Sequence, residues 1–124
     1  MIAADTSAWI SFFEGDDGAD VRALAKALEA RQVVMLSPVL TELLSDPELS
    51  PSVAQTLLEL PMVPLKDEFW VRAGKLRSRA LARERKARLG DALIAQCCID
   101  ADIPLITRDR DFKSFADALK LNLF

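Results

Sequence analysis

Four acidic residues lie where a predicted strand ends or a predicted helix begins. Asp5 follows the apolar run MIAA, Asp109 follows PLIT, Glu42 lies one helical turn after VVML, and Asp91 opens a helix that leads back toward PLIT. Ligands of open parallel sheets bind beyond the carboxyl ends of the strands. Carboxylates gathered there repel one another, and a hard divalent ion such as Mg²⁺ or Mn²⁺ relieves that repulsion. Such an ion lowers the pKa of bound water and neutralises phosphate charge.

Each acid also has a purely structural interpretation. Asp5 and Asp91 can cap the helices that follow them, and Glu42 can be a solvated helix residue. Asp111 is predicted chiefly to cap the last helix. Burying all these carboxylates together without partners would cost free energy. A cation shared among them is therefore favoured.

Composition excludes several other kinds of site. The chain has no histidine and no tyrosine, so a histidine general base and a zincin motif are excluded. Its four glycines are not spaced as a phosphate-binding loop. Cys97 and Cys98 are its only cysteines and are adjacent, which predicts small helix residues in a reducing, cytoplasmic setting.

The elements that must position the acids alternate between strands and helices. The 124 residues predict one domain, spanning 1–124, without linker or repeat and without a membrane span. Five short apolar runs predict buried parallel strands covered by helices on both faces. Pro64 predicts an edge position for its strand. The runs are MIAA, VVML, MVPL, PLIT and LNLF.

Capping signals predict the helices between these runs. Thr6 and Ser7 can begin the first helix, and Ser-Pro pairs at 37–38 and 50–51 begin two others. Asp67 can cap a long helix that runs to about Arg88. The remaining predicted helices are 18–30, a helix opening at Asp91 and a last short helix over 111–119.

Over essentially its whole length, the chain resembles PIN-domain nucleases, in particular VapC-type toxins of bacterial toxin–antitoxin pairs. The resemblance is carried by AADTSAWI, SPVLTELL, ARLGDALIA and LITRDRDF, in this order and spacing. It implies a three-layer α/β domain with a central parallel sheet of four or five strands. It also implies a metal-dependent endoribonuclease that leaves a 3′-hydroxyl and a 5′-phosphate, with Mg²⁺ or Mn²⁺ as cofactor.

The same resemblance assigns roles to residues. Asp5, Asp91 and Asp109 would hold the ion, and Glu42 would complete the acidic cluster by binding a second ion or orienting the attacking water. Thr6 and Thr107 match hydroxyl positions that support the site. Asp111 is a conditional addition, because the family varies in spacing before the final DF. The implied partners are RNA, an antitoxin protein that inhibits the enzyme, and a second copy in a homodimer.

Basic residues are concentrated between positions 72 and 88. The net charge is −3, but this stretch holds eight of the 16 lysines and arginines. Five of these residues recur at helical spacing and form one stripe. Such a stripe is either a solvated helix face or a track that binds RNA phosphates. Arg108 and Arg110 are predicted to balance the acids or to touch the substrate backbone. The stripe consists of Arg72, Lys75, Arg79, Arg83 and Lys86.

The few aromatic residues favour core or partner contacts over base stacking. Trp9, Phe12 and Phe13 are predicted to be exposed and to serve an antitoxin groove, whereas Trp70 and Phe112 have no such assignment.

Two other function classes stay open at this stage. An inactive RNA-binding or scaffold module would bind RNA without metal-dependent cleavage. An aspartate-based phosphatase or receiver domain would need a second aspartate two residues after Asp5, or a lysine after a late strand, and neither is present.

Overall fold

The five predicted apolar runs lie side by side as a short parallel sheet. The computed structural model describes residues 1–119 and 121–124. The central pair is β1 (Ala3–Ala4) and β2 (Leu105–Ile106), which run parallel. Single parallel bridges extend this pair on both sides: Ile2 bridges to Val33, Leu105 bridges to Leu123, and Met35 bridges in turn to Met62. The prediction of a parallel α/β architecture is confirmed, although only two segments of the described residues are regular strands.

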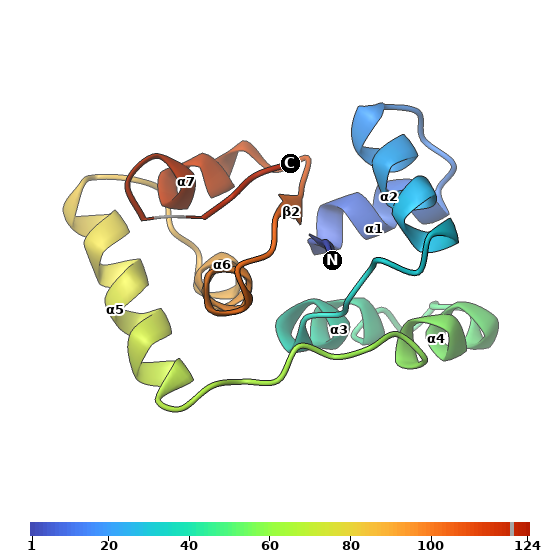
Figure 1. The fold of residues 1–124 in the computed structure, drawn as a ribbon, viewed down its shortest axis with the longest axis horizontal. Helices are drawn as coiled ribbons and strands as arrows, with labels where there is room; N and C mark the ends of the chain where they lie inside the picture. Colours follow the sequence, from blue (N-terminus) through green and yellow to red (C-terminus); the bar gives the residue numbers. More distant parts are fainter. Residues whose placement is uncertain (120) are drawn as a thin grey trace.

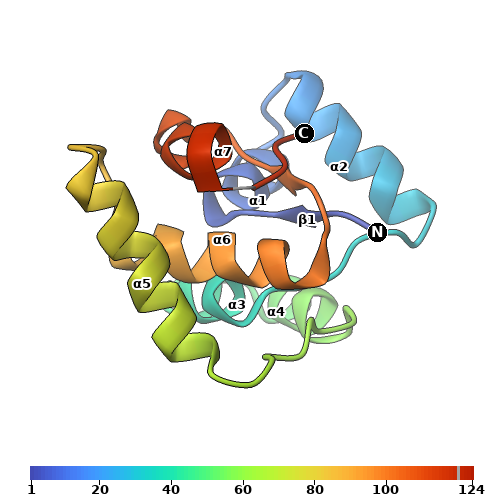
Figure 2. The same cartoon turned by 60° about the vertical axis from the view of Figure 1, so that its left-hand side comes forward.

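Helices cover both faces of this sheet. Figure 2 shows β1 between α1, α2 and α7 above and α3, α4 and α6 below. In Figure 1, α5 lies at the edge of the molecule, where it packs on α6. The bounds are α1 Thr6–Phe13, α2 Ala19–Glu29, α3 Ser37–Leu44, α4 Pro51–Leu58, α5 Phe69–Ala82, α6 Leu89–Ala101, the 3-10 helix η1 Arg110–Phe112 and α7 Lys113–Leu119.

A serine cap followed by proline begins α4 as predicted. The Ser50 hydroxyl accepts a hydrogen bond from the Val53 N–H, and Pro51 takes the first position of α4. The same prediction is wrong for α3, where Pro38 lies in the first turn but Leu36, without a side-chain cap, takes the cap position instead of Ser37.

At α1 the cap is the Asp5 carboxylate rather than Thr6 or Ser7. The predicted cap of α5 is wrong by one residue, because Glu68 precedes the helix, with a left-handed backbone and no side-chain cap.

The prediction that α5 continues to Arg88 is also wrong. The helix ends at Ala82, and Glu84 has a left-handed backbone, with φ 57°. The N–H of Glu84 donates to the Leu81 carbonyl and that of Arg85 to the Ala80 carbonyl, which is a Schellman ending. Arg77 Nε then donates to the Ala87 carbonyl at 2.8 Å and holds the returning loop.

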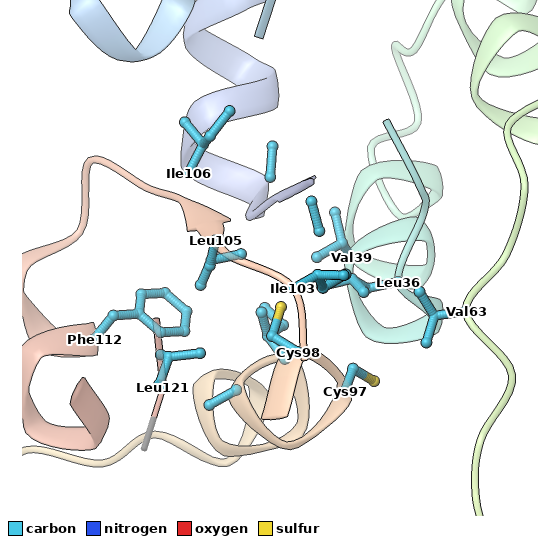
Figure 3. Packing of buried hydrophobic residues seen from close by; sticks show 14 of the residues in the cluster. Leu36, Val39, Val63, Cys97, Cys98, Ile103, Leu105, Ile106, Phe112 and Leu121 are labelled. Carbon is cyan, nitrogen blue, oxygen red and sulfur yellow. The ribbon is translucent and has the colours of Figure 1, made fainter. Parts of the chain in front are cut away.

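The core lies between the sheet and α6. Figure 3 shows Cys97 and Cys98 on α6 among apolar side chains that include Leu105 and Phe112. Both cysteines lie in a helix, as predicted. They are also buried, and burial raises the pKa of Cys97 to about 12. Because a thiol with so high a pKa stays protonated, these residues serve packing rather than chemistry.

Two further expectations concern the edges of the structure. Met62, two residues before Pro64, bridges to Met35, which fits the predicted edge position of this segment. In the part of the chain that the structure describes, no helix is long and apolar enough to cross a membrane.

Candidate metal centre

Asp5 lies at the junction of β1 and α1. Its N–H donates to the Ile106 carbonyl at 3.0 Å, which continues the strand pairing up to the carboxyl end of the sheet. One carboxylate oxygen, Oδ1, accepts from the Ala8 N–H at 2.9 Å and caps α1. Strand register and helix capping therefore both fix this side chain, which is only 3 % exposed.

Hydroxyl groups surround the Asp5 carboxylate. Ser7 Oγ donates toward both oxygens, at 2.8 and 2.9 Å, and Thr107 Oγ1 donates to Oδ2 at 2.6 Å. Burial raises the pKa of Asp5 above its ordinary value, and the hydrogen bonds from Thr107, Ala8 and Ser7 oppose that rise. These donors offset part of the cost of burying the carboxylate.

Thr107 connects Asp5 to the other acids. Its hydroxyl donates to Asp5 and accepts the Asp109 N–H at 2.9 Å. Asp109 Oδ1 in turn accepts the Asp111 N–H at 2.9 Å and so begins η1. The predicted capping role of Asp111 therefore belongs to Asp109, and the turn brings both carboxylates to the same side.

Asp91, Asp109 and Asp111 form the metal-binding candidate. One carboxylate oxygen from each residue lies within 4.8 Å of those of the other two. Asp91 Oδ2 is buried and has no hydrogen-bond partner in the described part of the chain. Burial raises the pKa of Asp91 to about 6, and the charge of Asp109 adds to the rise.

This donor set fits a hard divalent cation. Three carboxylates with an unsatisfied buried oxygen repel one another, and Mg²⁺ and Mn²⁺ prefer oxygen ligands. The three acids differ from the predicted ligands by one residue, because Asp111 is in the group and Asp5 is not. Asp5 still lies near, since its charge contributes to the raised pKa of Asp91.

Glu42 occupies the edge of the site. Its Oε1 accepts from Thr6 Oγ1 at 2.7 Å, and the side chain is exposed. A Cβ at Gly90 would lie 3.7 Å from Glu42 Oε2, so the glycine before Asp91 leaves room beside this carboxylate. The structure thus joins Glu42 and Thr6 directly and places both next to the start of α6.

The loop after α5 supplies positive charge near the triad. Lys86 Nζ lies 4.0 Å from Asp111 Oδ2, and the charge of Arg88 lowers the pKa of Asp91 against the larger effect of burial. Because α5 ends at Ala82, Arg83 and Lys86 do not continue the predicted helical stripe. Lys86 approaches the acids from this loop instead.

Two of the predicted RNA-binding arginines have partners within the chain. Arg72 pairs with Asp100 and also donates to the Asp67 carbonyl. Arg108 points to the start of α2, where its Nε lies 2.5 Å from Asp20 Oδ2. Lys75, Arg79 and Arg110 are exposed.

Two features of this region were not predicted from the sequence. Ser7 was considered only as a helix cap, but it donates to Asp5 and accepts the Arg108 N–H at 3.2 Å. Its position two residues after a strand-end aspartate was the available signal. Gly18 was also overlooked, although a Cβ there would meet Arg108 Nη2 at 2.7 Å and Asp20 Oδ1 at 2.5 Å.

The aromatic residues divide between the core and a shallow groove. Trp9 is 1 % exposed, so the prediction that it contacts a partner is wrong. It fills the core and stacks on Phe13, which is 37 % exposed. Phe13 and Ile10 line a hollow of about 180 Å³ together with Leu43, Leu49 and Glu42.

Comparison with known proteins identifies the family. Residues 2–118 match the PIN domain. The chain belongs to the PIN domain family. A VapC ribonuclease of Mycobacterium bovis and ribonuclease VapC11 of Mycobacterium tuberculosis are each 31 % identical to this PIN domain over 124 residues, covering 94 % of the chain and 92 % of the relative.

Solved structures share the fold at lower identity. FitAcB from Neisseria gonorrhoeae superposes with a TM-score of 0.77 at 19 % identity, covering 100 % of this chain and 96 % of the other. VapBC2 from Rickettsia felis, bound to a DNA fragment from its promoter, gives 0.70 at 21 % identity, with 100 % and 98 % coverage. These similarities confirm the predicted PIN-like α/β architecture.

Proposed function

We propose that this PIN domain is an endoribonuclease that hydrolyses RNA phosphodiester bonds with the help of Mg²⁺ or Mn²⁺. The relatives named as VapC ribonucleases support the activity. The observation that carries the metal dependence is the buried, unpartnered Asp91 Oδ2 beside the carboxylates of Asp109 and Asp111.

We assign the ion to Asp91 and Asp109, with Asp111 as a third ligand and Asp5 adjoining them. When bound, such an ion activates a water molecule and neutralises charge on the scissile phosphate. Thr107 and Ser7 hold Asp5 and the turn at Asp109 in place by hydrogen bonds. Hydrogen bonds that orient metal-binding side chains commonly affect metal affinity or activity by about 10–100-fold.

Glu42 has a different role in this proposal. Thr6 fixes one of its oxygens, and the other faces the gap beside Gly90, where an attacking water or a second ion would be accepted. A contact with an RNA phosphate needs an accessible cation. We therefore assign five basic residues to the RNA backbone, namely Lys75, Arg79, Arg83, Lys86 and Arg110.

We also propose that the enzyme is the toxin of a toxin–antitoxin pair. One structural neighbour is a member of the VapBC family of toxin–antitoxin systems from Mycobacterium tuberculosis, which supports an antitoxin partner. In this proposal the toxin is a homodimer that acts on RNA in the cytoplasm and is inhibited by the antitoxin.

Cleavage of mixed cellular RNA tests the activity. Asp91→Asn and Asp5→Asn should each lower the rate by at least about 100-fold, and a chelator should stop the wild type, because each change removes the ion or its support. Asp102→Asn is the matched control, since Asp102 lies at the opposite end of α6 and asparagine suits its left-handed backbone.

Cleavage that survives both site substitutions would reject the proposed site. RNA binding without metal-dependent cleavage would instead identify an inactive RNA-binding module. Toxicity on expression that a neighbouring gene's product relieves would support the antitoxin pairing separately.

A further inference from the structure

Phe124 places an exposed aromatic ring at the carboxyl end of the sheet. Residues 121–124 run parallel to β2, because the Leu105 N–H donates to the Asn122 carbonyl and the Phe124 N–H donates to the Leu105 carbonyl, both at 2.9 Å. The end of the chain therefore lies beside β2 (Figure 1), at the edge where ligands of open parallel sheets bind. Phe124 is 66 % exposed, although its backbone is held by the sheet.

The core does not explain the ring of Phe124. Side chains of an extended segment alternate between its two faces. Leu121 is buried and Leu123 is half-buried, whereas Asn122 and Phe124 are exposed. The two leucines therefore supply the apolar contacts of this segment with the core, and the aromatic residue at position 124 faces outward.

A hollow of about 230 Å³ lies beside Phe124 and adjoins the candidate metal centre. Thr107 and Asp109, which belong to that centre, form part of its lining. Arg110 on η1 and Lys113 at the start of α7 line it as well, and both are exposed. The hollow therefore offers an anionic group two accessible cations beside the proposed metal site.

The third basic residue of the hollow, Arg108, is engaged elsewhere. Its guanidinium pairs with Asp16 and Asp20. Arg110 and Lys113 therefore supply the positive charge for a ligand, and the adjacent aromatic ring supplies an apolar face. This combination matches a ligand that has both a flat face and a negatively charged group.

We propose that this hollow binds the nucleotide next to the scissile phosphate, with its base stacked on Phe124 and its own phosphate held by Arg110 and Lys113. Single-stranded nucleic acids are commonly bound by aromatic rings that stack on bases and by basic residues that follow the backbone. The inference rests on the proposed ribonuclease function and assigns a subsite for its substrate. Because only an unpaired base can leave its helix to stack on a side chain, the subsite selects single-stranded RNA.

Cleavage kinetics on a single-stranded RNA of mixed sequence test the stacking contact. Phe124→Leu keeps an apolar side chain but removes the flat ring, so the KM should rise at least about fivefold while kcat changes less. Phe124→Tyr keeps the ring and should keep the wild-type KM. Thermal unfolding of both variants should match the wild type, because the ring is outside the core.

Binding of the same RNA, labelled with a fluorophore, tests the phosphate contact independently of cleavage. In chelator, Lys113→Ala should weaken binding and lower the slope of log affinity against log salt concentration by about 0.7, because one phosphate contact is lost. Lys26→Ala is the matched control and should change neither quantity. Lys26 is exposed in the last turn of α2, which leads to the amino end of β1.

The outcomes separate the subsite from the proposed activity. An unchanged KM in Phe124→Leu, equal losses in Phe124→Leu and Phe124→Tyr, or unchanged binding in Lys113→Ala would overturn the subsite, and cleavage by the wild type would still support the ribonuclease. RNA binding without cleavage would reject the ribonuclease, and weaker RNA binding by Phe124→Leu than by Phe124→Tyr would then support the subsite. A wild type that neither binds nor cleaves RNA would overturn both.

Discussion

Two groups of three aspartates differ in how their charge is compensated. Asp16, Asp17 and Asp20 surround Arg108, whose guanidinium contacts Asp20 at 2.5 Å, Asp16 at 3.6 Å and the Asp17 carbonyl at 2.6 Å. The hydrogen bond from Arg108 lowers the pKa of Asp20. This first group has its cation built into the chain, so it needs no ion from solution.

Among the described residues, the second group, Asp91, Asp109 and Asp111, has a weaker built-in compensation, namely an ion pair of Lys86 with Asp111 and the nearby charge of Arg88. Lys86 stays 4.0 Å from Asp111, and its side chain is 70 % exposed. Burial raises the pKa of Asp91 to about 6, and Asp109 adds to this rise. The pKa of Asp20 in the first group is therefore lowered, whereas that of Asp91 in the second group is raised. This difference distinguishes a structural ion pair from a site that requires a mobile cation.

Removing the hydroxyl of Thr107 tests whether Asp5 and the triad act together. Thr107→Val should lower RNA cleavage by about 10–100-fold, because the link between Asp5 and the Asp109 N–H is lost. Thr107→Ser keeps the hydroxyl and should restore most of the rate. Unchanged cleavage in Thr107→Val would contradict the role of these hydrogen bonds, because valine keeps the γ-methyl group and lacks only the hydroxyl.

Removing Arg108 tests the structural group. Arg108→Ala should lower the free energy of unfolding, and by more than its matched control, because Asp20 and the Asp17 carbonyl lose a charged donor. Urea denaturation measures this loss. Arg22→Ala is the matched control, because its pair with Asp17 is exposed and such pairs contribute about 0–1 kcal/mol. An equal effect of both substitutions would contradict the distinction.

The pH dependence of stability gives the smallest expected effect. The pKa of Asp91 rises from 3.8 to about 6 on folding, so its contribution to stability is present below pH 3.8 and is lost as pH rises through 6. In chelator, Asp91→Asn should therefore gain stability over the wild type between pH 4.5 and 7.5. We expect a gain below about 1 kcal/mol, after allowing for solvent screening. A difference that does not change with pH would contradict the raised pKa.

The sequence predicted the strand segments and most of the site because both depend on local patterns. The short apolar runs and the acids that follow them indicate a parallel sheet with carboxylates at one end. The pairing of Thr107 with Asp5 joins residues 102 positions apart, and it could be anticipated only through the family resemblance. The grouping of Asp111 with Asp91 depends on the tight turn that Asp109 begins, which the spacing alone does not determine.

Helix ends were harder to predict because the usual signals are absent. Three helices end in left-handed residues that are not glycine, namely Arg31, Glu84 and Asp102. Glycine is the residue that normally marks such an ending. At Glu84 its absence led to a helix predicted six residues too long and to a basic stripe that included Arg83 and Lys86. Compensating contacts such as that of Arg77 with the Ala87 carbonyl come from distant positions and leave no local pattern.

Titration of metal-free protein with Mn²⁺ by calorimetry tests the central claim most directly. The wild type and Asp102→Asn should bind the ion with the same affinity, and Asp91→Asn should lose at least tenfold. Binding near pH 6 should also release protons, because the ion competes with protonation of Asp91. Absence of binding to the wild type, or equal binding by Asp91→Asn, would contradict the assignment of Asp91, Asp109 and Asp111 as a divalent-metal site.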